Sequence, residues 1–138
     1  MLAALLCGQG SDFVGGGLAQ ALSHAAGPRS SVSNGVVEAL LLPHTMRFNV
    51  PVTGHRLGLI ADALDGGSNR QGTPDERAVA AVERRLGSLG VPARLRDVDV
   101  EHEALGDIVE AALDDWSITR VPRAVKREDL AALLETAW

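Results

Sequence analysis

The stretch that decides the fold is "GLAQALSHAAGPRSSVSNGVVEALLLPHTMRFN", which runs from Gly17 to Asn49. Its apolar residues recur at intervals of three and four, which is the period of a helix that buries one face. The turn-forming residues "GPRSSVSN" divide the stretch in two, and either Ser33 or Asn34 is placed to cap the second helix. The stretch therefore predicts two helices folded back on each other.

The same helical period recurs in the other long segments, so we expect an all-α fold. Residues 1–138 would form a single helical bundle domain of about six helices. Three glycines at 15–17 interrupt the first apolar segment and predict either a kink or two separate helices within residues 2–26. The segment 66–72 is expected to be an exposed loop and 118–125 an extended connection. Further helices are expected at about 34–47, 54–64, 73–90, 101–116 and 127–138.

One helix start carries a particularly complete signal. Thr73 stands at the N-cap position, Pro74 at the first helical position, and Glu76 three residues after the cap completes a capping box. An earlier helix, which starts near residue 34, carries a stop signal: Asn49 and Pro51 are expected to end it near residue 47.

Composition limits the classes of partner and compartment. The net charge is −5, which gives no basic face for nucleic acid or for an anionic membrane surface. The one cysteine cannot form an internal disulfide, and no apolar run is long enough to span a bilayer. The first residues also lack the pattern of a secretory signal. We therefore expect a cytoplasmic protein with no nucleic-acid or membrane partner.

Taken with the linker "LGSLGVPARLRDVDV" and the closing "VPRAVKREDLAALLETAW", the opening stretch resembles the C-terminal helical domain of the iron-dependent alcohol dehydrogenase superfamily. The segment "LLPHTMRFN" is the most specific part of the likeness. The closing "LLETAW" and the turn "FNVP" lean towards the maleylacetate reductase branch. The resemblance covers nearly the whole chain but only about the last third of a family member, and the family's nucleotide-binding domain has no counterpart here.

The resemblance also bears on metal binding. In that family an upstream Asp and His hold a divalent metal together with two histidines spaced fourteen residues apart, and those two positions fall on Gln20 and Asn34. The upstream ligands have no counterpart in this sequence. Carboxamides are poor ligands for Zn²⁺ or Fe²⁺, which take imidazole or carboxylate donors. We therefore expect no metal ligand, no bound metal and no nicotinamide cofactor.

The remaining polar side chains suggest a reused substrate cleft. Gln20 and His24 are four residues apart and share one helix face. His24 and His44 are the candidate catalytic residues, because histidine titrates near neutral pH and serves as a general acid or base. The alternative for His24 is a satisfied core residue, and the alternative for His44 is a hydrogen-bond partner for backbone carbonyls at a bend after Pro43. The predicted substrate-binding residues are Gln20, Asn34, Glu38 and Asn49.

Three functions stay open at this point. The first is a metal-free, nicotinamide-independent small-molecule enzyme or binding protein that performs a non-redox step such as isomerisation, cyclisation or elimination. The second is the helical subunit of a split reductase, and the third is a degenerate, non-catalytic fragment. Because the family buries one face of this bundle against its nucleotide domain, we expect a homodimer or a partner chain.

Overall fold

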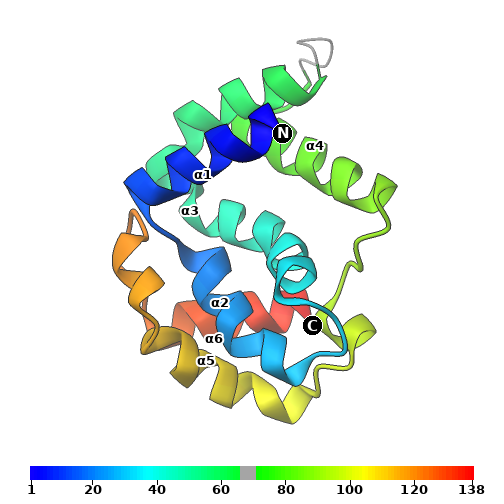
Figure 1. The fold of residues 1–138 in the computed structure, drawn as a ribbon, viewed down its shortest axis with the longest axis vertical. Helices are drawn as coiled ribbons and strands as arrows, with labels where there is room; N and C mark the ends of the chain where they lie inside the picture. Colours follow the sequence, from blue (N-terminus) through cyan, green and yellow to red (C-terminus); the bar gives the residue numbers. More distant parts are fainter. Residues whose placement is uncertain (66–70) are drawn as a thin grey trace.

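The structure is a computed structural model that describes residues 1–65 and 71–138. These residues contain six α-helices, four short 3-10 turns and no β-strand, which confirms the all-α prediction. Figure 1 shows α2, α5 and α6 together in the lower half, and α3 running up from them to pair with α4 in the upper half. No helix in the described ranges is long and apolar enough to cross a membrane. Most of the segment 66–72, predicted to be a loop, lies outside the described residues.

The N-terminal segment forms two helices, α1 (Leu2–Val14) and α2 (Leu18–Ala26). The glycines at 15–17 therefore separate two helices and do not merely kink one. Gly15 has φ 75°, a conformation that residues with a side chain rarely adopt. Gly16 lies so close to the Gln20 Oε1 atom that a Cβ would clash with it. The glycines therefore let the chain turn and also let it approach Gln20.

Helix α3 (Asn34–Asp65) contradicts the prediction of two helices ending and restarting around Pro51. Both Pro43 and Pro51 lie inside it. Each proline removes one backbone hydrogen bond, but α4 packs along α3 and this tertiary contact keeps the helix continuous. The two halves of α3 run in different directions in Figure 1, as expected for a helix that contains prolines.

Helix α4 (Pro74–Ser88) begins as predicted. The Thr73 backbone N–H donates to Glu76 Oε2 at 2.9 Å, and the Glu76 N–H donates to Thr73 Oγ1 at 3.4 Å. The capping box is therefore present in full. After α4, the 3-10 turn η2 (Leu95–Val98) brings the chain back to the core, where Leu95 and Val98 are buried.

The C-terminal part is more broken than predicted. Helix α5 spans only Leu105–Leu113, because a separate 3-10 turn, η3 (His102–Ala104), precedes it. The start of the expected extended connection is instead another 3-10 turn, η4 (Trp116–Arg120), in which the Ser117 N–H is capped by the Asp115 side chain. Helix α6 (Arg127–Ala137) matches its prediction closely.

The main core lies where α2, the first half of α3, α5 and α6 meet. Its fully buried side chains include Leu22, Leu41, Ile108, Leu130 and Leu134. A smaller apolar cluster joins the second half of α3 to α4. The main core holds α2 and η4 in place, because Leu22 of α2 is buried in it and Ile118 of η4 packs against it.

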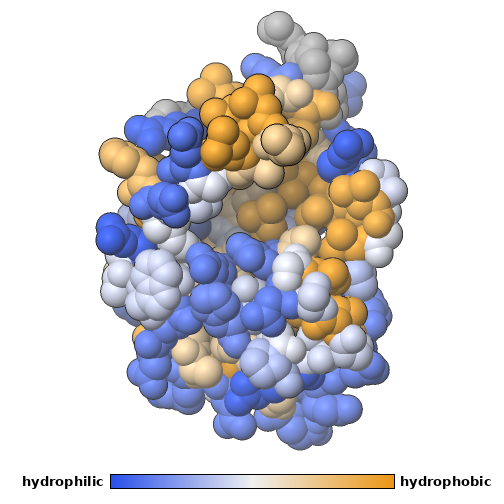
Figure 2. Space-filling view, in the orientation of Figure 1, coloured by the Kyte–Doolittle hydropathy of each residue, from blue (hydrophilic) through white to orange (hydrophobic). Residues whose placement is uncertain are grey.

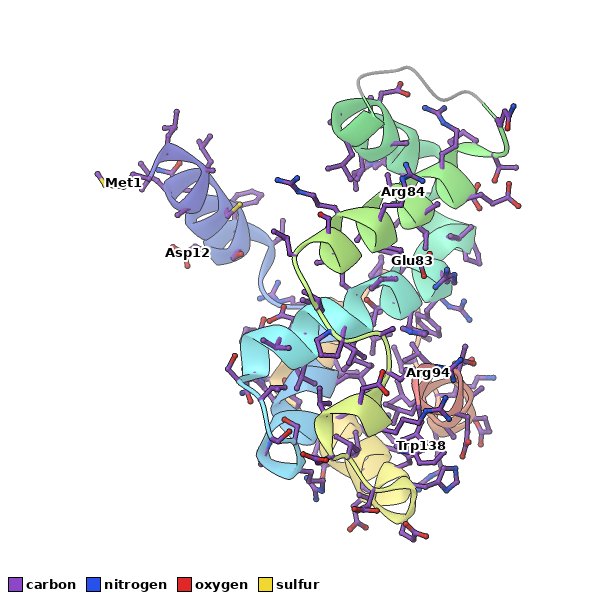
Figure 3. The ribbon with its side chains drawn as sticks, turned by 90° about the vertical axis from the view of Figure 1, so that its right-hand side faces the viewer. Met1, Asp12, Glu83, Arg84, Arg94 and Trp138 are labelled. Atoms are coloured by element: carbon purple, nitrogen blue, oxygen red, sulfur yellow. The ribbon has the colours of Figure 1, made fainter. Side chains whose placement is uncertain are left out.

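Helix α1 stands apart from this core, and no residue in it is buried. It overlies α3 in Figure 1, but the rotated view in Figure 3 shows it projecting away from the other helices. Its large apolar side chains include Leu2, Leu5, Leu6 and Phe13, with Phe13 90% exposed. Figure 2 shows this apolar helix standing over a hollow in the same face of the molecule.

Candidate functional site

One polar site is built along a single ridge of α2. Gln20 and His24 are four residues apart in α2, so they lie on one face and form this ridge, and Gly16, just before the helix, lies against the Gln20 side chain. That face contacts η4, which begins directly after Asp115. The ridge becomes more exposed towards its C-terminal end, where His24 reaches the surface.

His24 is paired with a carboxylate from a distant part of the chain. Its Nδ1 atom lies 2.8 Å from Asp115 Oδ2, and the side chains are 40% and 14% exposed respectively. The other carboxylate oxygen of Asp115 accepts the Ser117 N–H at 2.8 Å and so caps η4. Asp115 is therefore fixed by the backbone while it orients the imidazole.

These contacts set the charge of Asp115. Partial burial acts to raise the pKa of Asp115, but the hydrogen bonds from His24 and from the Ser117 N–H outweigh it. The pKa of Asp115 consequently lies below its ordinary value, and the carboxylate is ionised at neutral pH. An ionised partner favours the His24 tautomer that carries its proton on Nδ1.

Beside the other end of the ridge, where Gln20 is half-buried, lies a buried polar residue of η4. Ser117 is fully buried, and within the described ranges its Oγ atom makes no hydrogen bond of standard geometry. Gln20 Oε1 lies against Gly16 where a Cβ would clash with it, and Ser117 Oγ lies 3.0 Å from that Cβ position. Gln20 thus projects towards η4 from the ridge that carries His24.

Asn34 and Glu38 lie at the start of α3. Asn34 is its first helical residue, and its Oδ1 atom lies against Gly27 on the turn that follows α2. Both Asn34 and Glu38 are exposed. The structure therefore places Asn34 at the hairpin predicted from the sequence, and leaves Glu38 on the surface.

His44 lies farther along α3 and faces other elements. It lines a cavity of about 260 Å³ between α3 and α4, and a second cavity between α3 and α6. Burial, followed by the positive charge of Arg47, lowers the pKa of His44, so its ring is neutral at physiological pH. His24 faces η4 instead, so we treat the two histidines as two separate sites.

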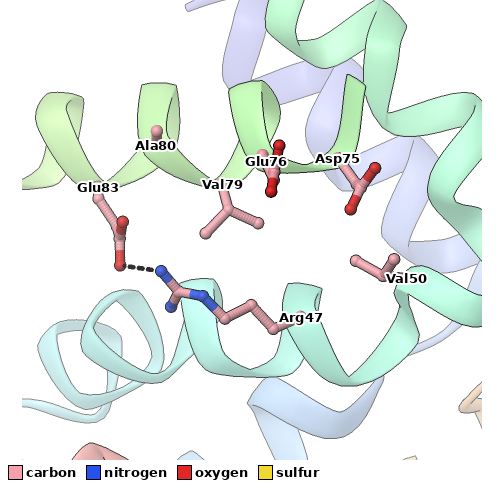
Figure 4. Close-up of a pocket in the computed structure, with 7 residues that line it drawn as sticks. All are labelled: Arg47, Val50, Asp75, Glu76, Val79, Ala80 and Glu83. Carbon is pink, nitrogen blue, oxygen red and sulfur yellow. Dashed lines mark hydrogen bonds and ion pairs between the residues drawn. The ribbon is translucent and has the colours of Figure 1, made fainter. Parts of the chain in front are cut away.

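An ion pair divides the groove between α3 and α4. Arg47 donates to Glu83 at 2.7 Å across the groove, as Figure 4 shows. On one side of this pair lies a cavity of about 390 Å³ with Val50 and Val79 in its walls, and on the other side lies the His44 cavity. Asn49 is half-buried on the same helix, and its Oδ1 atom has no hydrogen-bond partner within the described ranges.

Sequence reasoning missed Asp115 as a member of the site. The residue lies 91 positions from His24, so no local pattern joins the two. The one available signal was the position of Asp115 near the end of a predicted helix and two residues before Ser117. An aspartate in such a position often caps the next turn through its side chain. That signal predicts a cap but not a histidine partner.

The comparison with known families agrees with the fold. The sequence model described as "Fe-containing alcohol dehydrogenase family, C-terminal" matches residues 1–138. The chain belongs to this family. The resemblance drawn from the sequence is therefore confirmed, whereas the lean towards maleylacetate reductases finds no support among the relatives described next.

Two curated relatives illustrate the likeness. Lactaldehyde reductase of Escherichia coli K12 is 36% identical over 135 residues, which are 96% of this chain and 35% of that protein. The 1,3-propanediol dehydrogenase of Klebsiella pneumoniae is 30% identical over 138 residues, covering 99% of this chain and 36% of that protein. The chain thus spans about a third of the length of the curated relatives it matches.

A solved structure supports the same assignment. The crystal structure of a 1,3-propanediol oxidoreductase superposes with a TM-score of 0.80 at 30% identity. The match covers 88% of this chain and 32% of that one. The helical arrangement described above is therefore that of an iron-type alcohol dehydrogenase over the matched region.

The iron named in the family description does not fit the donors found here. Gln20 and Asn34, the two positions that the resemblance assigns to metal ligands, carry neutral carboxamides. Within residues 1–65 and 71–138, no group of three or more His, Cys, Asp and Glu side chains is arranged to hold a metal ion. Protein sites for iron rely on imidazole, carboxylate or thiolate donors, so we derive no step through a metal.

Proposed function

We propose that this domain binds a small molecule with a carbonyl or hydroxyl group beside α2 and transfers a proton on it, with His24 as the acid–base group. The observation that carries the proposal is the 2.8 Å hydrogen bond between His24 Nδ1 and Asp115 Oδ2. With the Nδ1 proton held by the carboxylate, Nε2 carries the lone pair that accepts a proton. The 40% exposure of the His24 side chain leaves room for a substrate to approach.

In this proposal Gln20 orients the substrate's oxygen atoms from the same helix face, and Asn34 does so from the start of α3. Amide groups donate and accept hydrogen bonds without a charge, which suits a neutral substrate. The proposal uses His24 alone as the acid–base group, because His44 faces α4 and α6. Glu38 and Asn49 stay predicted substrate contacts.

The substrate class follows from the relatives' names. The chain matches part of a lactaldehyde reductase, and lactaldehyde is an α-hydroxyaldehyde. A base that removes the proton from C2 of lactaldehyde, with protonation of the aldehyde oxygen, gives an enediol. Loss of the C2 hydroxyl proton and return of a proton to C1 then gives hydroxyacetone. The isomerisation is redox-neutral, so it requires neither a metal nor a nicotinamide.

The test is proton exchange at C2 of lactaldehyde, followed by NMR in D₂O with the purified chain. We expect the wild type to accelerate the exchange and His24→Ala to lower that rate by about 10²–10⁴-fold. His102→Ala is the matched control, because His102 is also an exposed histidine, with its Nε2 3.0 Å from a Glu135 carboxylate oxygen. Exchange no faster than with free imidazole at equal concentration would overturn the proposal.

A second candidate function is the helical half of a two-chain reductase. The specific observation in its favour is α1, whose apolar residues are exposed along the whole helix. The matched region is also only about a third of each relative, so a partner supplying the remainder would cover such a surface. Because Gln20 and Asn34 stand at the two metal-ligand positions, the hydride transfer in such a complex would have to proceed without iron.

This candidate is tested by mixing the chain with the part of E. coli lactaldehyde reductase that precedes the matched region. Light scattering is expected to report a one-to-one complex, and NADH oxidation with lactaldehyde is expected to appear only in the mixture. A complex that forms with the wild type but not with Phe13→Asp would place the contact on α1. The absence of any complex at high micromolar concentration would refute the candidate.

A further inference from the structure

The cavity beside His44 has mostly apolar walls, with His44 and Glu83 as its charged or titratable residues. Helix α3 contributes Leu40 and Pro43, α4 contributes Leu86, and the segment after α4 contributes Val91. The volume is about 260 Å³. An apolar cavity of about 150 Å³ in another protein is large enough to bind benzene, so this one has room for a single ring with a substituent.

His44 is the polar group that differs from these walls. Within the described parts of the chain its ring forms no hydrogen bond, although the side chain is half-buried. Since the ring is neutral, it presents one N–H donor and one lone-pair acceptor. A hydroxyl group that enters the cavity would replace water at this ring, and a hydrogen bond within the protein is modestly favoured over one to water.

The charges around the cavity favour an uncharged occupant. Glu83 lies on the rim, but its carboxylate is paired with Arg47 at 2.7 Å. Glu83 contributes a negative charge near His44, while Arg47 and Arg94 contribute positive charges, so the surrounding charges are mixed in sign and do not select an ion of either sign. Burial of either ion in apolar walls would add a desolvation cost.

We propose that this cavity is a binding site for a small, uncharged, apolar molecule that carries one hydroxyl group, which hydrogen-bonds to His44. The site is separate from the proton-transfer site at His24 and does not depend on it. Failure of the lactaldehyde exchange experiment would therefore leave this inference standing, and failure of this inference would leave the exchange proposal standing.

Phenol and benzene are the probes, because they differ by a single hydroxyl group. Binding is followed by NMR of the full chain, through shifts of the amide and methyl signals of Leu40, Leu86 and Val91. We expect both probes to shift these signals, with phenol binding more tightly. A hydrogen bond of ordinary net strength corresponds to a change in Kd of about 2- to 12-fold.

Two variants at His44 test the hydroxyl contact. His44→Leu is expected to abolish the preference for phenol while leaving benzene bound, because leucine keeps the apolar volume and removes both polar groups. His44→Gln is expected to keep most of the preference, since its amide can donate and accept. Equal affinity of the two probes for the wild type, or an unchanged preference in His44→Leu, would overturn the proposed contact.

A third variant tests the cavity itself. Gly87 lines the cavity within α4, and a Cβ placed there meets no heavy atom within 4 Å. Gly87→Leu is therefore expected to fold and to weaken the binding of both phenol and benzene. Gly106→Leu in α5 is the matched control, because its Cβ also has open space and it lies outside the cavity lining. Unchanged binding of both probes in Gly87→Leu would refute this cavity as their site.

Discussion

Replacing Asp115 with alanine tests whether the carboxylate holds both η4 and His24. The side chain caps η4 through the Ser117 N–H and accepts a hydrogen bond from His24. Loss of a capping side chain costs about 1 kcal/mol. The bond to His24 adds about 0.5 kcal/mol, because His24 is 40% exposed and solvent screens the interaction. We expect Asp115→Ala to lower the free energy of unfolding by about 1.5 kcal/mol.

A double-mutant cycle separates the two contributions. His24→Ala alone is expected to cost about 0.5 kcal/mol, and the double variant no more than Asp115→Ala, which gives a coupling energy of about 0.5 kcal/mol. The free energies are measured by urea unfolding at pH 7, followed by circular dichroism. The control cycle uses His102 and Glu135, whose side chains are 48% and 58% exposed and whose coupling should be close to zero.

The effect of Asp115→Ala also depends on pH. Because the folded state lowers the pKa of Asp115, its ionised form stabilises the protein above the pKa of the unfolded carboxyl group. That stabilisation is lost as the pH falls through the lower, folded value. The difference between wild type and Asp115→Ala should therefore be largest near neutral pH and smaller in acid. Equal stabilities at pH 7, or no coupling to His24, would refute the reasoning.

Three further predictions follow from other parts of the molecule. Protein purified without chelator should hold no stoichiometric iron or zinc by elemental analysis, because carboxamides stand at Gln20 and Asn34; about one metal ion per chain would contradict this. Light scattering at high micromolar concentration should report a dimer, which Phe13→Asp converts to a monomer by placing a charge on the apolar face of α1. A wild-type monomer with no co-purifying partner would count against that surface. Thr73→Ala should lower the free energy of unfolding by about 1 kcal/mol in the same urea assay, since it removes the capping box of α4, and an unchanged midpoint would show that the cap contributes little.

The elements that the sequence predicted well depend on contacts within a few residues. The capping box at Thr73 joins groups three residues apart. The interruption at glycines 15–17, predicted as either a kink or two helices, reflects the conformational freedom of the backbone itself. Gln20 and His24 share a face because helical geometry repeats every 3.6 residues. The family likeness also came from local motifs such as "LLPHTMRFN" (residues 41–49), which lies within the first half of α3 and includes the buried Leu41 and Thr45.

The features that the sequence alone did not determine depend on contacts between distant segments. Pro51 is a strong local signal for the end of a helix, yet α3 continues through it because α4 packs alongside. Asp115 meets His24 only because the core holds η4 against α2, and His44 faces a cavity only because α4 and the segment after it close one side. A side chain's partners are set by which helices pack together, and a local periodicity specifies the face of a helix without specifying what that face meets.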